Sequence, residues 1–170
     1  EPGFNMPTGL IEVSSSIYDD FGEDALPYFM EPAMSPYSTP DLYEEYPLVL
    51  TTGARPWGFF HSEHRQIPHL RALHPNPEFE IAPETAEEYG IGQGDWCWIE
   101  TRRGRIKMRA NVEPEVHPNV VFAPRGWWFP EREATDDLHG AFDSNCNVLF
   151  ENNGPYDPAV GTDNYGGLCK

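Results

Sequence analysis

Hydrophobic and polar residues alternate most regularly in residues 95–114, "DWCWIETRRGRIKMRANVEP". From position 105 to position 112 every second residue is apolar, which is the pattern of a β-strand with one face in a core. Residues 96–99 predict a preceding strand, and "RRG" supplies the turn that joins the two strands. The positions predicted to face the core are Ile106, Met108, Ala110 and Val112.

Three shorter apolar runs predict further strands: "YPLVLTTG" at 46–53, "FEIA" at 79–82 and "NVVFAP" at 119–124. After the second of these, Pro83 is placed to begin a short helix that Gly90 ends. Short strands separated by small helices favour a β-barrel over alternating β–α–β units. The pattern therefore predicts a mainly β fold for residues 48–170.

Residues 1–47 have a different texture, because prolines recur every few residues and exclude long helices and central strands. We expect an extended acidic arm, packed on the barrel or on domains outside this chain, because it carries too many apolar groups for a solvated tail. The start, without Met or a leader, leads us to expect a piece of a longer polypeptide. The apolar residues of the arm are Phe4, Leu10, Ile11, Val13, Ile17, Tyr18, Phe21, Leu26, Tyr28 and Phe29.

The end of the chain is polar and rich in Asn and Gly, "DSNCNVLFENNGPYDPAVGTDNYGGLCK" from residue 143. It holds few residues of the kind that build a core, so we predict that this segment contacts another molecule or surface and adds little to the hydrophobic core. Asn side chains offer a donor and an acceptor together, which suits the edge of a heterocycle.

The chain has 170 residues with 11 Lys and Arg, 28 Asp and Glu and a formal net charge of −17. Such a charge repels phosphate polymers, so we expect no nucleic-acid partner. Three cysteines without a CxxC spacing indicate neither a disulfide scaffold nor a zinc site. No apolar run approaches the roughly 20 residues of a membrane span, so we expect no direct membrane insertion.

Residues 55–74 depart from this acidity, since no Lys or Arg precedes Arg55 and the segment then carries three Arg and four His against one carboxylate. Its histidines could hold a divalent metal, although Pro68 interrupts a helical spacing. His61, Ser62 and Glu63 have the residue types of a catalytic triad, but neighbours in sequence do not make one. A non-catalytic metal-binding domain and a protein-interaction domain therefore stay open as alternatives.

A phosphate site is the stronger interpretation of "TTGAR", residues 51–55. A glycine at the end of a buried strand allows a ligand to approach the backbone, and Arg55 can offer a fork of donors to a phosphate. The segment matches neither a P-loop nor a dinucleotide-binding GxGxxG turn. Further along, the adjacent rings of "RGWWFPE" could wall a flat ligand.

In order and spacing, several segments resemble the C-terminal part of the dimethyl sulfoxide reductase family of molybdenum and tungsten oxidoreductases. They include "GFNMPTGLIEVSS", "LPYFMEPAMSPYSTPDLYEEYPLVLTTG" and the stretch from "PEFEIAPE" to "NVVFAP", and together they cover essentially the whole chain. The resemblance implies the molybdopterin-dinucleotide-binding domain, a six-stranded double-psi β-barrel with a few short helices. It implies a cofactor-binding fragment of the catalytic subunit that is inactive alone.

The resemblance also implies a site. Thr52, Gly53 and Arg55 match the family's "TGR" segment, with Ala54 as an extra residue, and His61 with Ser62 match a pair that lies along a pterin and its phosphates. Asn147 matches the asparagine of the family's "N.LT" segment, with Phe150 where Thr is usual. The terminal segment that approaches a pterin in relatives contains Asp157, Asn164 and Tyr165.

The implied cofactor is bis(molybdopterin guanine dinucleotide) with molybdenum or tungsten, positioned for redox or oxygen- and sulfur-transfer chemistry. No residue of this chain is implied as a metal ligand or as catalytic. An iron–sulfur cluster is implied in a missing N-terminal region, and the implied partners are the remaining domains of the same subunit and an iron–sulfur electron-transfer subunit. The protein is implied to be prokaryotic, in the cytoplasm or the periplasm.

Overall fold

The structure is a computed structural model that describes residues 3–53, 55–151, 156–159, 161–162 and 166–170. The chain forms two compact units. The arm unit combines Glu1–Glu31 with Asn152–Asn164, and the barrel unit combines Pro32–Glu151 with Tyr165–Lys170. The helices are α1 (Ser16–Asp20), α2 (Pro40–Glu45), α3 (Pro68–Arg71), α4 (Pro83–Glu88), α5 (Asp137–Ser144) and the 3-10 turn η1 (Cys146–Val148).

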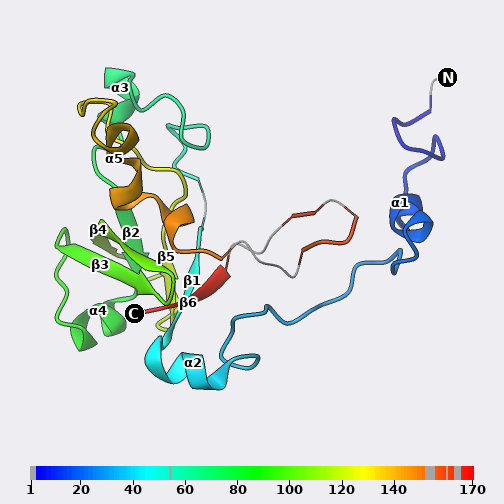
Figure 1. Cartoon of the computed structure of the whole chain (residues 1–170), viewed down its shortest axis with the longest axis horizontal. Coiled ribbons are helices and arrows are strands. Elements are labelled where there is room, and N and C mark those ends of the chain that lie inside the picture. The colour runs from blue at the N-terminus through cyan, green and yellow to red at the C-terminus, as the bar shows by residue number, and fades with distance from the viewer. Residues whose placement is uncertain (1–2, 54, 152–155, 160, 163–165) are drawn as a thin grey trace. The chain divides into compact units, whose positions relative to one another are not determined.

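Six strands of the barrel unit form one mixed sheet in the order β3-β4-β2-β5-β1-β6 (Figure 1). Parallel pairs join β1 to β5 and β2 to β4, while the other neighbours are antiparallel. The strands are β1 (Leu48–Thr51), β2 (Glu78–Ile81), β3 (Trp96–Thr101), β4 (Gly104–Val112), β5 (Val120–Phe122) and β6 (Gly166–Cys169).

The sheet curls until its two edges meet. The backbone N–H of Glu100 in β3 donates to the carbonyl of Lys170 at 2.9 Å, and the N–H of Lys170 donates to the carbonyl of Glu100 at 3.0 Å. Closing a sheet in this way leaves fewer unpaired strand edges. The mainly β fold with six strands and a few short helices is therefore confirmed.

The predicted hairpin is present, and its alternation decides which face is buried. Ile106 and Met108 are completely buried in β4, whereas Lys107 between them is exposed. The core lies on this face of the sheet, where apolar side chains gain most by leaving water. It contains Leu48, Leu50, Phe79, Ile81, Ala86, Ile99, Ile106, Met108, Ala110, Val121, Ala123, Cys146, Leu149, Phe150 and Cys169.

The structure corrects the prediction that the polar end of the chain only makes contacts. Leu168 and Cys169 are buried in β6, which pairs antiparallel with β1. Leu149 and Phe150 also lie in the core. The segment has few apolar residues, but strand pairing places nearly all of those at its two ends inside the barrel.

Short helices follow the proline signals. α3 begins at Pro68 and α4 begins at Pro83, because proline at the first helical position sacrifices no hydrogen bond within the helix. Gly90, with φ of +67°, follows the end of α4 as expected. The longest helix in the described part of the chain has 8 residues, so none reaches the length of a membrane span.

Candidate functional site

A cavity of about 290 Å³ opens in the barrel unit where β1 ends. Thr52, Gly53 and Arg55 line it, and residues from β2, β4, β5 and the loops 74–76 and 124–127 complete its wall. We call it the Thr52 pocket. The structure therefore brings together three of the residues that the sequence singled out for a phosphate.

Gly53 is required at this point for two reasons. Its φ is +57°, in the left-handed region that side chains disfavour, and a Cβ added there would lie 3.1 Å from the Cβ of Phe122. Any larger residue would both strain the backbone and press on the strand behind it. Glycine therefore lets the chain turn closely past Phe122 and leaves an exposed backbone at the edge of the pocket.

Arg55 is exposed, and its Nη1 lies 3.2 Å from Nε2 of His61. The guanidinium also lies 5.5 Å from the centre of the Phe60 ring, which helps to hold it in place. His61 is not among the residues that line the Thr52 pocket, but it contacts Arg55, which does line it. Two nitrogen-bearing side chains therefore stand together at the mouth of the pocket.

The inner wall contributes donors that have no partner. Trp127 is 1% exposed, and its indole Nε1 makes no hydrogen bond in the described structure. His74 also lines the pocket, and its buried Nε2 likewise has no partner. An unpaired buried polar atom costs about 1–3 kcal/mol. These two nitrogens indicate that a hydrogen-bonding group from outside belongs in the pocket.

Acceptors line the same pocket. Asn76, Glu78 and Glu80 contribute amide and carboxylate oxygens beside the basic groups. Burial, and then the nearby Glu113, raise the pKa of Glu80. A ligand with both phosphate and heterocycle edges would match this mixture of donors and acceptors better than a simple anion.

Arg65 fixes the loop that carries Trp127. It is completely buried, and its Nε and Nη2 donate to the carbonyl of Gly126 at 3.2 and 3.1 Å. Its guanidinium lies 4.3 Å from the centre of the Phe59 ring and 3.9 Å from that of Trp127. Burial, together with Arg71, lowers the pKa of Arg65 to about 10.

Neither Arg65 nor His74 matches a residue that the family resemblance assigns to the cofactor, yet the structure buries Arg65 fully and His74 in part. Arg65 is inside the barrel unit, and His74 is partly buried between Trp57 and Phe59 at ring distances of 6.2 and 5.9 Å. No motif in the sequence indicated these roles. The aromatic residues spaced around them, which can stack on a guanidinium, were the available signal.

Ser62 lines a second cavity of about 330 Å³ with Gly126, Trp127 and Trp128. The indole of Trp128 donates to the carbonyl of Ser62 at 2.6 Å, and a Cβ on Gly126 would lie 2.9 Å from that of Ser62. The two loops therefore lie in direct contact. Ser62 is separated from Thr52 by the Trp127 side chain, which lines both cavities.

Asn147 is exposed at the 3-10 turn η1, and its backbone N–H donates to Oδ1 of Asn145 at 3.0 Å. Asn145, rather than Asn147, lines the second cavity. Asn164 and Tyr165 lie outside the described residues. Of the four polar residues expected in these segments, the structure therefore describes Asn147 and Asp157.

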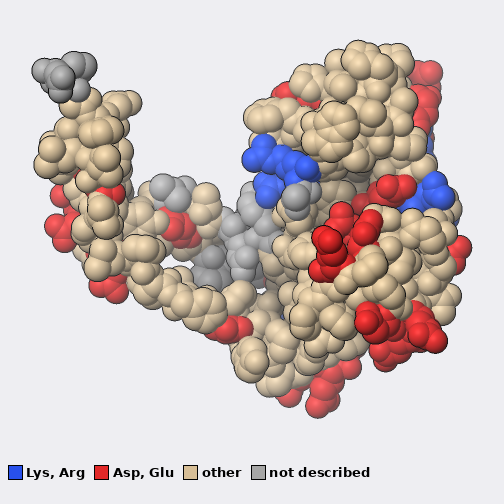
Figure 2. Space-filling view, turned by 180° about the vertical axis from the view of Figure 1, so that it is seen from behind, with Lys and Arg blue, Asp and Glu red and all other residues tan. Residues whose placement is uncertain are grey.

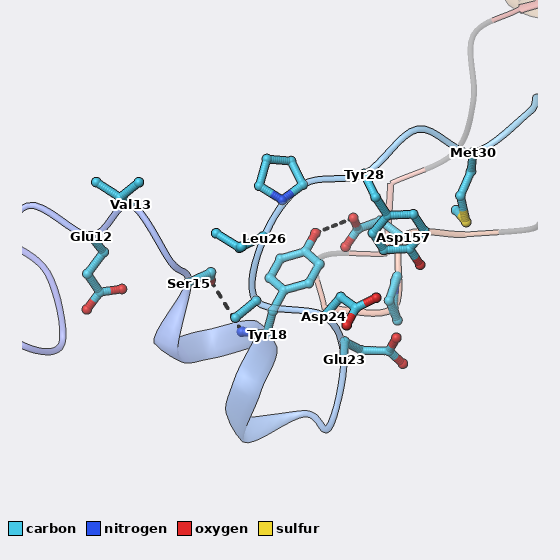
Figure 3. Close-up of a pocket in the computed structure, with 13 residues that line it drawn as sticks. Glu12, Val13, Ser15, Tyr18, Glu23, Asp24, Leu26, Tyr28, Met30 and Asp157 are labelled. Atoms are coloured by element: carbon cyan, nitrogen blue, oxygen red, sulfur yellow. Dashed lines mark hydrogen bonds between the residues drawn. The ribbon is translucent and has the colours of Figure 1, made fainter.

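Asp157 belongs to the arm unit, where it lines a cavity of about 400 Å³. Figure 3 shows the hydroxyl of Tyr18 pointing at the Asp157 carboxylate, to which it donates a hydrogen bond. This bond raises the pKa of Tyr18, because the phenol must stay protonated to donate. The pair ties α1 to the segment around residue 157 within the arm unit.

Neither the metal site nor the catalytic triad considered for the basic segment gains support. Among the described residues, no group of three or more His, Cys, Asp or Glu is arranged to hold a metal ion. His61 pairs with Arg55 instead of activating Ser62, whose carbonyl accepts from Trp128. The geometry favours binding of a ligand over chemistry by these side chains.

Comparisons with known proteins agree with this geometry. The family described as "Molydopterin dinucleotide binding domain" matches residues 48–169. The chain is 42% identical over 168 residues to dopamine dehydroxylase from Eggerthella lenta, covering 96% of this chain and 16% of that protein. It is 34% identical over 168 residues to acetylene hydratase from Syntrophotalea acetylenica, covering 97% of this chain and 23% of that protein.

A solved structure shares the fold. Acetylene hydratase from Pelobacter acetylenicus superposes with a TM-score of 0.84 at 33% identity, and the alignment covers 99% of this chain and 24% of that one. The chain therefore spans between about a sixth and a quarter of the length of these relatives. By its sequence and its fold, the chain belongs to the molybdopterin-dinucleotide-binding domain family of molybdenum and tungsten oxidoreductases.

Proposed function

We propose that this chain binds bis(molybdopterin guanine dinucleotide), with molybdenum or tungsten, as one domain of a larger catalytic subunit. The observation that carries the proposal is the Thr52 pocket, whose lining combines Gly53 and Arg55 with His74 and Trp127, two residues whose buried ring nitrogens have no hydrogen-bond partner in the described structure. The bound group supplies the redox or oxygen- and sulfur-transfer chemistry, while this chain supplies binding and orientation.

The phosphate end of the ligand is assigned to the mouth of the pocket. Gly53 lets a phosphate oxygen approach the backbone, and the Thr52 hydroxyl and the Arg55 guanidinium lie on either side of it. Nε2 of His61 lies 3.2 Å from Nη1 of Arg55 and can accept a hydrogen bond that orients the guanidinium. Charge-assisted hydrogen bonds of this kind offset the cost of removing phosphate charges from water.

A heterocycle edge is assigned to the inner wall. Trp127 and His74 can donate from Nε1 and Nε2, and Glu80 and Asn76 can accept, so both kinds of edge atom find a match. The family resemblance assigns further positions to the cofactor, namely Ser62, Asn147, Asp157, Asn164 and Tyr165.

The other parts of the proposal concern the native polypeptide that carries this chain. The relatives are several times longer, so we propose that other domains of the same subunit complete the cofactor site and cover the apolar arm. The same proposal includes an iron–sulfur cluster upstream and an iron–sulfur electron-transfer subunit as partner. It also includes a prokaryotic location in the cytoplasm or the periplasm. The isolated chain is proposed to be inactive, because a ligand held between domains loses most of its contacts when one stands alone.

The test is Arg55→Ala in the native polypeptide, with Arg103→Ala as the control because Arg103 is exposed in the β3–β4 turn, away from the Thr52 pocket. Pterin content by fluorescence and metal content by mass spectrometry should fall together in Arg55→Ala, by about tenfold for the loss of one bidentate phosphate contact. The control should keep both. Unchanged loading in Arg55→Ala would remove Arg55 from the site.

A further inference from the structure

A groove of about 850 Å³ lies on the outer face of the β3–β4 hairpin, and among its lining residues only Asn76 also lines the Thr52 pocket. Trp96 and Trp98 of β3 line it and remain 48% and 52% exposed. These two residues lie on the face of the strand opposite the buried Ile99. Two half-exposed tryptophans side by side on one strand are typical of a surface that another molecule covers.

Cations from β4 lie over these rings. The Arg105 guanidinium is 4.4 Å from the centre of the Trp98 ring, and the Lys107 ammonium is 5.5 Å from that of Trp96. Both contacts are diagonal across the hairpin, because Trp98 pairs directly with Lys107 and Trp96 pairs with Arg109. Among the described residues, neither Arg105 nor Lys107 has a carboxylate within salt-bridge distance.

The groove is basic on a chain that is strongly acidic. Four cationic side chains and two carboxylates line it, whereas the whole chain has 11 Lys and Arg against 28 Asp and Glu. Carboxylates cover more of the face seen in Figure 2 than Lys and Arg do. The groove therefore carries a local positive charge that is opposite to the net charge of the chain.

The inner end of the groove holds a donor without a partner. Arg71 uses Nη2 to reach Oε1 of Glu131 at 3.2 Å, but its buried Nη1 makes no hydrogen bond in the described structure. A guanidinium presents its donors as a fork that matches a carboxylate. The groove therefore offers free cations at its rim and an open hydrogen-bonding position inside.

We propose that this Trp96/Trp98 groove is a docking surface for an acidic polypeptide segment that lies outside this chain. Charge complementarity selects the chemistry, because the partner's carboxylates meet Arg105, Lys107 and Arg71 while its apolar atoms cover the two indoles. The relatives are several times as long as this chain, so a segment of the same polypeptide is available to occupy the groove. The proposal does not depend on what the Thr52 pocket binds.

Zero-length carbodiimide cross-linking of the purified native polypeptide tests the proposal directly, because this reagent joins an amine to a carboxylate in contact with it. The chain has two lysines, Lys107 and Lys170. Lys107 should be joined to an Asp or Glu outside these 170 residues, as identified by mass spectrometry. Lys170 is the internal control, since its Nζ lies 3.6 Å from Glu45 and 3.7 Å from Glu100. A Lys107 that stays unmodified, or is joined only within the chain, would overturn the proposal.

A second experiment uses the 170-residue chain with poly-L-glutamate as the probe. A chain of net charge −17 repels this polymer, so calorimetric binding requires a specific basic surface. Arg105→Gln with Lys107→Gln should weaken the affinity by about tenfold or more, while Arg103→Gln, an exposed cation in the adjoining turn, should stay within about twofold. The absence of binding, equal losses in both variants, or displacement of the polymer by guanosine monophosphate would each contradict an acidic polypeptide partner.

Discussion

The barrel unit and the arm unit contain similar kinds of apolar residues but use them in opposite ways. The described residues of the arm unit include none that is buried, and Val13 and Phe29 are each 83% exposed. In the barrel unit Leu50, Ile106 and Met108 are completely buried. Hydrophobic residues stabilise a fold only where the backbone can pair and bring them together, and the prolines of the arm prevent that pairing.

The arm unit is held by polar contacts. Tyr18 donates to Asp157, and Glu12 accepts hydrogen bonds from Thr8 and Ser16. Such contacts define a local shape but contribute little net stability when they are exposed to water. We therefore expect the barrel unit to carry nearly all of the free energy of unfolding. The four predictions below test this difference, beginning with the largest effect.

A matched pair of leucine substitutions should give the largest contrast. Leu50→Ala in β1 should lower the free energy of unfolding by about 2–5 kcal/mol, because it leaves a cavity in the barrel core. Leu10→Ala, at a side chain that is 68% exposed, should change it by less than about 0.5 kcal/mol. Urea unfolding followed by circular dichroism measures both. Equal losses would show that the arm contributes to a shared core.

Arg65→Met tests the loop that walls the Thr52 pocket. The substitution keeps much of the buried volume but leaves the carbonyl of Gly126 without its two donors, which should cost about 1–3 kcal/mol. Hydrogen exchange should also accelerate at Trp127 and Trp128, whose loop loses its anchor. Arg103→Met is the control, since that side chain is exposed in the β3–β4 turn. An unchanged free energy of unfolding would mean that the buried charge costs as much as its contacts provide.

Deletion of residues 1–31 should leave the barrel intact. Because the described residues of this segment include no buried side chain, the free energy of unfolding should shift by less than about 0.5 kcal/mol. Binding of a hydrophobic dye should decrease, since the exposed apolar side chains are removed. Loss of cooperative unfolding in the shortened chain would contradict the division into two units.

The smallest effect concerns the arm unit alone. The Asp157 carboxylate holds the pKa of Tyr18 above its usual value, so Tyr18 should be among the later tyrosines to ionise in an ultraviolet titration. A raised pKa in the folded state favours folding below the ordinary tyrosine pKa, and this contribution is lost as the pH rises through the folded value. Asp157→Asn should return the titration of Tyr18 toward the ordinary range. The same curve in both proteins would exclude this contact.

Much of the barrel was predictable because its signals are local. Alternation in 105–112 identified β4 and its buried face, and Pro83 marked the start of α4. β6 was missed because "GGLC" has no periodic pattern, and its strand exists only through pairing with β1. A sequence cannot indicate a strand whose identity depends on a partner more than a hundred residues away.

The candidate site divides in the same way. Thr52, Gly53 and Arg55 were predicted as a group, because they follow one another at the end of a strand. Trp127 and His74 join them only through folding, and no motif in the sequence indicated that Arg65 is completely buried. Arginine side chains are mostly exposed in proteins. Arg65 can be buried because its guanidinium lies over the rings of Phe59 and Trp127 and donates to the carbonyl of Gly126.

The sequence by itself determined the mainly β class, the strands β1 to β5 and the glycine-containing loop that follows β1, because periodicity, proline and glycine act over a few residues. The tertiary structure decided that the barrel closes at Glu100 and Lys170, that Trp127 walls the pocket and that Trp96 and Trp98 gather cations on an acidic chain. Those features depend on strand order and register, which fix side chains beside neighbours far away in the sequence.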